Sequence, residues 1–525
     1  MFENCILGTM FAHMSQKELN MLEKNKSYKD VTTAEFDMLQ SLSNQGQHQV
    51  AISLAKKLLK DYVVSSTLNN FIGVSYSNLG ENHLAINYFK RSIELSPNFS
   101  HAFNNLGVSY LQLQEIEKAK SSFEEATRLS PEIPHFHYNL SKPLYVNSEH
   151  ELAIKALKKA ISLRRNYPNA FNDLGNCLVE VGQMDEAISA YHQALKLDPN
   201  YIEAYGNIGL TYFKMGKPEE ALNGYIKALE LNPSCGVTKA NLVELLKEKN
   251  FDDVKGHQIL ALDSKIKQKD IKNFQDATND IIINDVSVFL KTLKQTEPNL
   301  RTKATQLFKR NSADLNCKRH LKLFATHKVI PEFCFGCFKV QVEVKNVLDL
   351  IRLASLFYNI DFGVNLTRKC MIETRSFSGG FYKGFIYCSS LQQAKDVVNK
   401  LSHETTNLDW QSIVKIKRGC TEYALEYPGF ENVDKDAPSM TYPESWKEQE
   451  IQFDKKYSLP PLKTKLQSLS GFCLSDLLVI ERWIDYAKGI GDSTVEAFQA
   501  RPVKYADTYE LAKCRIEKIP FIAEA

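Results

Sequence analysis

The chain has 525 residues, of which 43% are hydrophobic and 24% are charged, and its formal net charge at pH 7 is +3. This composition is typical of a globular protein with about two to four domains. A charge so near neutral gives no reason for nucleic acid or an anionic membrane as the main partner, so we expect neither. No apolar run approaches the roughly 18 residues of a membrane-spanning helix, and we therefore expect no membrane insertion.

The N-terminal segment, residues 1–31, precedes any regular pattern. Its opening stretch, MFENCILGTMFAHM, has a short apolar run but no basic start, and it carries Glu3, which is unlike a signal peptide. Met14 is an alternative start. We expect a cytoplasmic protein, in which the eleven cysteines are reduced and act as metal ligands or buried thiols.

From residue 32 onward the sequence repeats with a period of 34 residues. A glycine, an alanine, an aromatic residue and a proline return at fixed offsets. The columns are Gly73, Gly107, Gly175 and Gly209; Ala85, Ala119, Ala153, Ala187 and Ala221; Phe89, Phe123, Tyr191 and Tyr225; and Pro97, Pro131, Pro199 and Pro233. Apolar residues recur at helical spacing in two short segments of each block, which predicts a pair of helices per repeat.

Each column has a physical reason. The glycine and the alanine fall where two helices touch, and only a small side chain permits close approach there. We expect the aromatic residue to fill the gap between neighbouring pairs and the proline to end the second helix. One pair cannot bury its apolar face alone, so the pairs have to stack.

The repeats differ in how well they keep the columns. The expected array consists of a degenerate block at 32–65, four strong repeats at 66–99, 100–133, 168–201 and 202–235, a weaker repeat at 134–167 and a closing helix at 236–249. In the weaker repeat, Ser141, Leu157 and Arg165 replace the glycine, the aromatic residue and the proline.

These columns resemble those of the tetratricopeptide repeat (TPR), whose period and helix–turn–helix unit match. The resemblance implies a mainly α fold, with an α-α superhelical solenoid of about six repeats over residues 32–249. It also implies a concave face, lined by the first helices, that binds a peptide or protein partner.

Another column lies just before the Leu-Gly column of the repeat. It contains Asn105, Asn139, Asp173, Asn207 and, in the closing helix, Asn241. This row is similar to the asparagine ladder in the repeats of O-linked N-acetylglucosamine transferases, and that resemblance implies a groove that holds peptide backbone. An amide both donates and accepts, which suits an unpaired peptide group. The alternative is that asparagine is simply common at this position of the repeat.

The second half of the chain lacks the 34-residue repeat and has a mixed pattern of helices and strands. We expect a helical connector at 250–311, a cysteine-rich α+β domain at 312–428, and a linker with terminal helices at 429–525. The α+β domain has two strands that flank Gly379-Gly380 and pair as a hairpin, which would place Cys370 nearly opposite Cys388. The basic stretch KIKRGC at 415–420 alternates as a strand face does, and together with Arg368, Arg375 and Lys383 near this hairpin it is also a candidate anion site.

Cysteine and histidine in the same region have the spacing of a zinc site. The four candidate ligands are Cys317, His320, Cys334 and Cys337, with two residues inside each pair and thirteen between the pairs. Thiolate and imidazole suit zinc, which is the one cofactor that we expect. The alternative is that these cysteines pack as small apolar side chains.

The leading function is therefore an interaction scaffold that binds a peptide or protein in the concave groove. The alternative is a transferase, in the manner of a glycosyltransferase, whose repeats select protein substrates. No phosphate-binding loop or nucleophile motif occurs in the sequence to support a reaction. An enzyme would be distinguished by a deep pocket in the second half, lined by converging polar groups.

Overall fold

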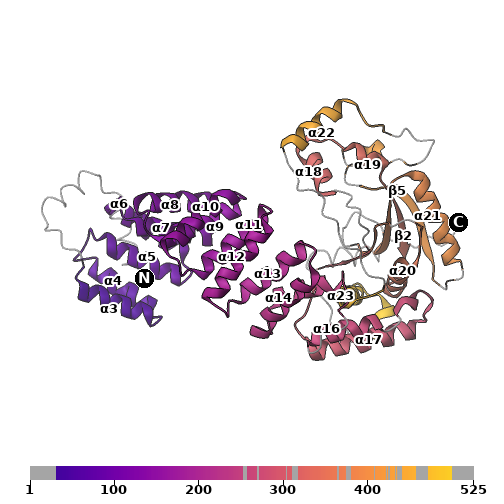
Figure 1. Ribbon diagram of the computed structural model, residues 1–525, viewed down its shortest axis with the longest axis horizontal. Helices are drawn as coiled ribbons and strands as arrows, with labels where there is room; N and C mark the ends of the chain where they lie inside the picture. The colour runs from indigo at the N-terminus through magenta and orange to yellow at the C-terminus, as the bar shows by residue number, and fades with distance from the viewer. Residues whose placement is uncertain are drawn as a thin grey trace. The chain divides into compact units, whose positions relative to one another are not determined.

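The computed structural model forms two compact units, one up to Thr211 and one from Tyr212 (Figure 1). The boundary falls inside helix α13 (Ile202–Lys214), not at residue 249 where the sequence pattern ends. The structure describes residues 31–251, 257–268, 271–302, 304–309, 317–363, 366–373, 380–406, 408, 410–420, 423, 426–431, 433, 440–456 and 471–498. The N-terminal segment 1–30 and the expected last helix beyond 500 lie outside these residues.

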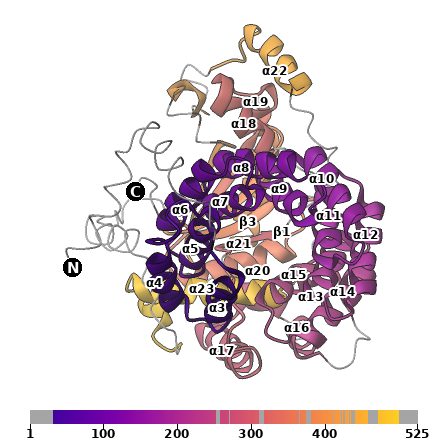
Figure 2. The same ribbon diagram turned by 90° about the vertical axis from the view of Figure 1, so that its left-hand side faces the viewer.

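The first unit is an array of helix pairs, as the repeat predicted. Its helices are α3 (Thr33–Asn44), α4 (His48–Leu58), α5 (Ser66–Asn78), α6 (Asn82–Leu95), α7 (Ser100–Gln112), α8 (Ile116–Leu129), α9 (Pro134–Val146), α10 (His150–Leu163), α11 (Pro168–Glu180), α12 (Met184–Leu197) and the start of α13. Helices adjacent in sequence pack together from α3 to α12. Figure 2 shows α5, α7, α9 and α11 on the inner side of the curve and α6, α8, α10 and α12 on the outer side.

A glycine of the first helix meets an aromatic ring of the second helix in three of the four strong pairs, those of Gly73, Gly107 and Gly175. A Cβ atom at Gly107 would lie 2.7 Å from Cε1 of Phe123, and one at Gly73 would lie 2.5 Å from Cε1 of Phe89. Real Cβ atoms essentially never approach so closely, so the contact admits only glycine. The ring fills space inside its own pair, which corrects our expectation that it fills the gap between pairs.

The weaker repeat satisfies the same packing constraint with different residues. Ser141 stands where the other repeats have glycine, and its side chain is buried at 2% exposure. The facing residue is the smaller Leu157 in place of a ring, and it is fully buried. A larger residue on the first helix is thus matched by a smaller one on the second, so close packing is preserved.

The second unit begins with the last helices of the array, α14 (Pro218–Leu231) and α15 (Gly236–Leu246), which pack together. They are followed by α16 (Gln258–Gln268), the short 3-10 helix η1 (Ile271–Asp276) and α17 (Asn279–Thr296). A buried ion pair joins Lys239 of α15 to Glu297 at the end of α17. The Asp263 carboxylate of α16 accepts a hydrogen bond from the backbone N–H of Leu474 at 2.8 Å. The closing helix of the repeats is therefore built into the second unit.

A five-stranded antiparallel sheet lies at the centre of the second unit. Its strands are β1 (Gln306–Lys309), β2 (Phe338–Val344), β3 (Arg368–Ile372), β4 (Tyr382–Cys388) and β5 (Ser412–Arg418), in the order β1-β3-β4-β2-β5. Helices α20 (Val347–Asn359) and α21 (Leu391–Thr405) pack on it, and α23 (Leu474–Gly489) packs on α20. The expected antiparallel strands are confirmed, but β1 falls in the region that we expected to be a helical connector.

The expected pairing of two cysteines across the hairpin is wrong. Strands β3 and β4 do pair, but Cys370 lies opposite Gly384, and Cys388 lies opposite Phe338 of β2. Gly380 has a positive φ of 69°, whereas Gly379 lies outside the described residues. The connection between the strands is longer than a tight turn, and this shifts the register.

Three further helices form a small aromatic-rich layer in the second unit. They are α18 (Cys317–His327), α19 (Glu332–Gly336) and α22 (Ser445–Lys456). The short 3-10 helix η3 (Pro428–Glu431) joins this layer through Phe430, whose ring lies 5.2 Å from that of Phe335, whereas η4 (Ser493–Val495) contacts α20 and α23. Arg319 of α18 bonds the carboxylates of Asp454 at 2.7 Å and Glu450 at 3.0 Å, and so holds α22 in place. Helix α22 lies in a stretch that we expected to be linker.

We predict that Gly107→Ala lowers the free energy of unfolding of the array by about 1–3 kcal/mol, because the new methyl group overlaps the Phe123 ring. Urea denaturation measures the change. The matched control is the double variant with Phe123→Leu, which combines a small side chain with leucine as the weaker repeat does and should recover part of the loss. Additive losses in the double variant would contradict the contact that we describe.

Candidate functional site

The asparagine column links successive inner helices through hydrogen bonds. Each amide donates to an asparagine of the preceding repeat, 35 residues earlier. The bonds run from Asn105 Nδ2 to Asn70 Oδ1 at 3.0 Å, from Asn139 Nδ2 to Asn104 Oδ1 at 2.9 Å and from Asn207 Nδ2 to Asn172 Oδ1 at 2.9 Å. Three of the five candidate groove residues are thus structural bridges between repeats.

The accepting residues form a second column that the sequence reasoning missed. Asn70, Asn104 and Asn172 recur with the same period, one position before the ladder residues, and that period was the signal. Asn104 and Asn172 are 5% exposed, so their amides need partners. Asn104 also donates to its neighbour Asn105 at 3.3 Å, which joins α5, α7 and α9 through one chain of amides. Asn241 lies in α15 of the second unit, outside this set.

At Asp173 of α11, a carboxylate replaces the amide found at the other positions of the ladder. Its carboxylate accepts from Asn172 Nδ2 at 3.2 Å, and it interacts with the hydroxyl group of Tyr138 on α9. Burial raises the pKa of Asp173, and the Tyr138 hydroxyl, Asn172 and the ammonium group of Lys142 partly oppose that shift. A desolvated negative charge therefore replaces an amide at one place on the inner face.

The charge of this carboxylate acts on four tyrosines. They are Tyr138 and Tyr145 of α9, Tyr167 at the start of α11 and Tyr201 at the start of α13. Burial raises the pKa of each, and the charge of Asp173 raises it further; the pKa of Tyr201 reaches about 12. The rings of Tyr138 and Tyr167 lie 5.0 Å apart, centroid to centroid. We refer to Asp173 and these four residues as the tyrosine cluster.

The structure brings two of the four candidate zinc ligands, His320 and Cys334, together. The side chain of Cys317 lies outside the described residues. His320 Nδ1 lies 3.5 Å from the Cys334 sulfur, which also lies 3.6 Å from the Tyr423 hydroxyl. Cys337 instead packs against Gly419. Among the described residues, no group of three possible ligands could hold a metal ion.

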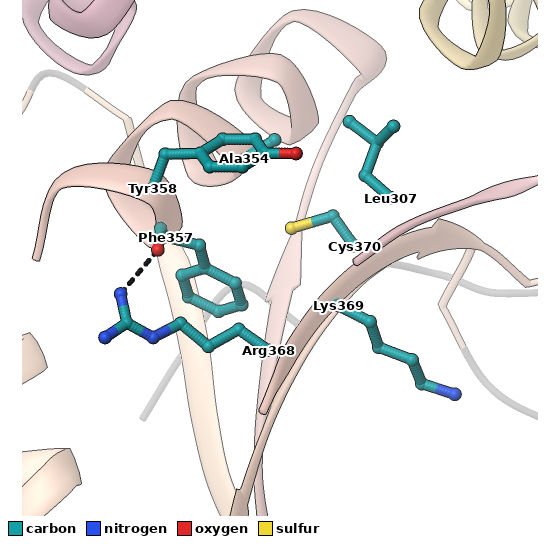
Figure 3. A pocket seen from close by; sticks show the side chains of 7 residues that line it. All are labelled: Leu307, Ala354, Phe357, Tyr358, Arg368, Lys369 and Cys370. Carbon is teal, nitrogen blue, oxygen red and sulfur yellow. Dashed lines mark hydrogen bonds between the residues drawn. The ribbon is translucent and has the colours of Figure 1, made fainter. Parts of the chain in front are cut away.

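The cavities of the second unit that we describe are small. One of about 10 Å³ lies beside Arg368 and Cys370 and has room for no more than one water molecule (Figure 3). The Arg368 guanidinium donates to the carbonyl groups of Phe357 and Ile360, so it holds the end of α20. A second cavity of about 140 Å³ lies beside Asp263 and Lys267, which pair at 2.7 Å.

The anion site expected near the hairpin does not form as predicted. Arg368 is used internally, and burial lowers its pKa to about 10. Lys383 lies 3.7 Å from the Glu373 carboxylate. Arg375 lies outside the described residues.

Family models identify the repeats. Models described as tetratricopeptide repeat match residues 66–99, 100–133 and 202–235, and one described as TPR repeat matches 175–216. The chain therefore carries an array of tetratricopeptide repeats. No curated protein matches the chain. Within the described residues, no helix combines the length and the apolar character that crossing a membrane requires.

Several solved structures resemble the array. The crystal structure of MamA is 30% identical, covers 31% of this chain and 95% of its own, and has a TM-score of 0.30. YrrB, described as a TPR protein with an unusual peptide-binding site, is 25% identical, covers 35% of this chain and 96% of its own, and has a TM-score of 0.32. A thermophilic TPR protein of Thermus thermophilus is 23% identical, with coverages of 35% and 99% and a TM-score of 0.29.

We predict that Asp173→Asn stabilises the array at neutral pH. Because burial raises the native-state pKa above the ordinary value of 3.8, the ionised carboxylate costs stability at neutral pH. That cost disappears as the pH falls below the ordinary carboxyl pKa of 3.8, because the group is then protonated in both the folded and the unfolded chain. The free energies of unfolding of variant and wild type should therefore converge in acid. Urea unfolding at neutral pH and at about pH 3.5 measures the difference. Asp185→Asn, an exposed carboxylate on α12, is the control, and equal effects of both changes would contradict the prediction.

The zinc site stays a prediction, and the different surroundings of Cys334 and Cys337 define a specific test of it. Elemental analysis of chain expressed with ample zinc should find about one ion per chain. Cys334→Ser should lose that ion, because Cys334 lies beside His320, whereas Cys337→Ser should keep it. Absence of zinc from the wild-type chain would end the proposal.

Proposed function

We propose that the inner face of the first unit binds an extended peptide segment of a partner protein. The supporting observation is the row of amides along that face. An amide nitrogen carries two hydrogens, and the ladder bond of Asn105, Asn139 or Asn207 uses one of them. Each residue can therefore bridge two repeats and still donate to an unpaired peptide carbonyl. The structural and the binding roles of the ladder are compatible.

Exposed side chains on the same face supply contact area. Tyr145 of α9 is 39% exposed, although the charges of Glu180 and Asp173 of α11 act on its hydroxyl group. His101 and His135 are exposed at the starts of α7 and α9, with ring centroids 6.1 Å apart. Aromatic side chains give much contact area for little lost conformational entropy, which suits a recognition surface.

The transferase alternative gains no such support. The two cavities described in the second unit, of about 10 and 140 Å³, are smaller than the roughly 300 Å³ at which ligand pockets begin. We propose a binding protein for a protein partner rather than for nucleic acid, for which a net charge of +3 gives no reason. A reducing location such as the cytoplasm fits the eight described cysteines, which are free thiols.

We predict that Tyr145→Ala weakens binding of peptides selected from a displayed random library on the full chain. The expected loss is roughly tenfold, the effect of removing one aromatic anchor. Fluorescence anisotropy with a labelled selected peptide measures it. The matched control is Leu152→Ala, which removes a 51% exposed side chain from the outer helix α10 and should leave the affinity unchanged. Equal affinity of both variants would contradict the proposed groove.

A further inference from the structure

The tyrosine cluster departs from the amide-to-amide hydrogen bonds of the ladder, although its buried carboxylate costs stability. At the other junctions an amide donates to an amide, and both groups are neutral. At the junction of α9 and α11 a carboxylate stands in the donor column and Tyr138 in the acceptor column. An ionised carboxylate can only accept, so the direction of the interaction is reversed.

The Asp173 carboxylate is incompletely compensated. Its two oxygens can accept about four hydrogen bonds, and the described contacts are Asn172 Nδ2 at 3.2 Å and the Tyr138 hydroxyl group. The Lys142 ammonium group acts on it but lies over the Tyr138 ring, 4.7 Å from the centroid. Burial raises the pKa of Asp173 more than these three interactions lower it. An additional positive charge would therefore stabilise the ionised carboxylate.

Negative charge dominates around the four rings. The charged groups around them are the carboxylates of Asp173, Glu180, Asp198 and Glu203, the guanidinium group of Arg164 and the ammonium group of Lys142. The Arg164 guanidinium lies 4.9 Å from the centroid of the Tyr167 ring. That contact shows that a ring of this cluster accepts a cation on its face, as the aromatic quadrupole favours.

We propose that the tyrosine cluster binds the side chain of a lysine or arginine in the captured peptide, with Asp173 as the counter-charge and the tyrosine rings as the walls. The inference rests on the proposed peptide-binding function and adds a sequence preference to it. The ladder amides hold the peptide backbone without regard to sequence, and the cluster fixes the register of the peptide through one basic residue. The incoming side chain supplies the close positive charge that Lys142, whose ammonium group lies over the Tyr138 ring, does not provide.

Selection of displayed random peptides on the full chain tests this inference, with wild type and Asp173→Asn used in parallel. The variant restores the amide found at the other junctions, so its fold is preserved and its groove remains. Wild type should enrich peptides with a lysine or arginine at one fixed position, and Asp173→Asn should enrich peptides without that preference. A wild-type peptide should bind the variant about tenfold more weakly. Asp185→Asn on the outer helix α12 is the charge-matched control and should keep the basic preference.

The outcomes separate the two proposals. Peptides enriched on wild type without a basic preference would overturn the role of the cluster and leave the peptide groove standing. The same basic preference on Asp173→Asn as on wild type would also overturn it, since the counter-charge would then be irrelevant. No enrichment on either chain would overturn the groove and the cluster together.

Discussion

The structure of the first unit depends on the contact between a glycine and an aromatic ring inside three of its helix pairs. Gly73, Gly107 and Gly175 leave no room for a side chain against Phe89, Phe123 and Tyr191. The fully buried Ala85 and Ala119 lie in the same core as the Phe89 and Phe123 rings. The ladder residues of the first helices lie on the face for which we propose peptide recognition.

The asparagine ladder adds a polar connection between neighbouring repeats. Apolar stacking alone is not directional, whereas the bond from Asn139 to Asn104 specifies how one first helix lies against the next. Asp173 departs from this arrangement and places a desolvated charge where its neighbours have neutral amides. Natural sequences tend to depart from a stabilising pattern at functional sites. For this reason we propose ligand recognition at that position.

The sequence predicted the helix pairs well because a period of 34 residues repeats every constraint several times. It did not predict strand β1 or helix α22, since a four-residue strand carries little pattern and α22 is polar along much of its length. The register of β3 and β4, which separates Cys370 from Cys388, depends on a long connection that residue spacing does not define. In the site, the ladder column was recognised, but its bonding partners one position earlier were not, because contacts between repeats are absent from a single repeat's pattern.

The most direct test of the central claim, that the inner face of the array holds the peptide, is site-specific photo-crosslinking. A photoreactive phenylalanine analogue replaces Tyr145 on inner helix α9 in one sample and Leu152 on outer helix α10 in another, and each chain is irradiated with a peptide selected on the unmodified protein. Our account predicts a covalent adduct from position 145 and little or none from position 152. An adduct from position 152 that equals or exceeds that from 145 would contradict it.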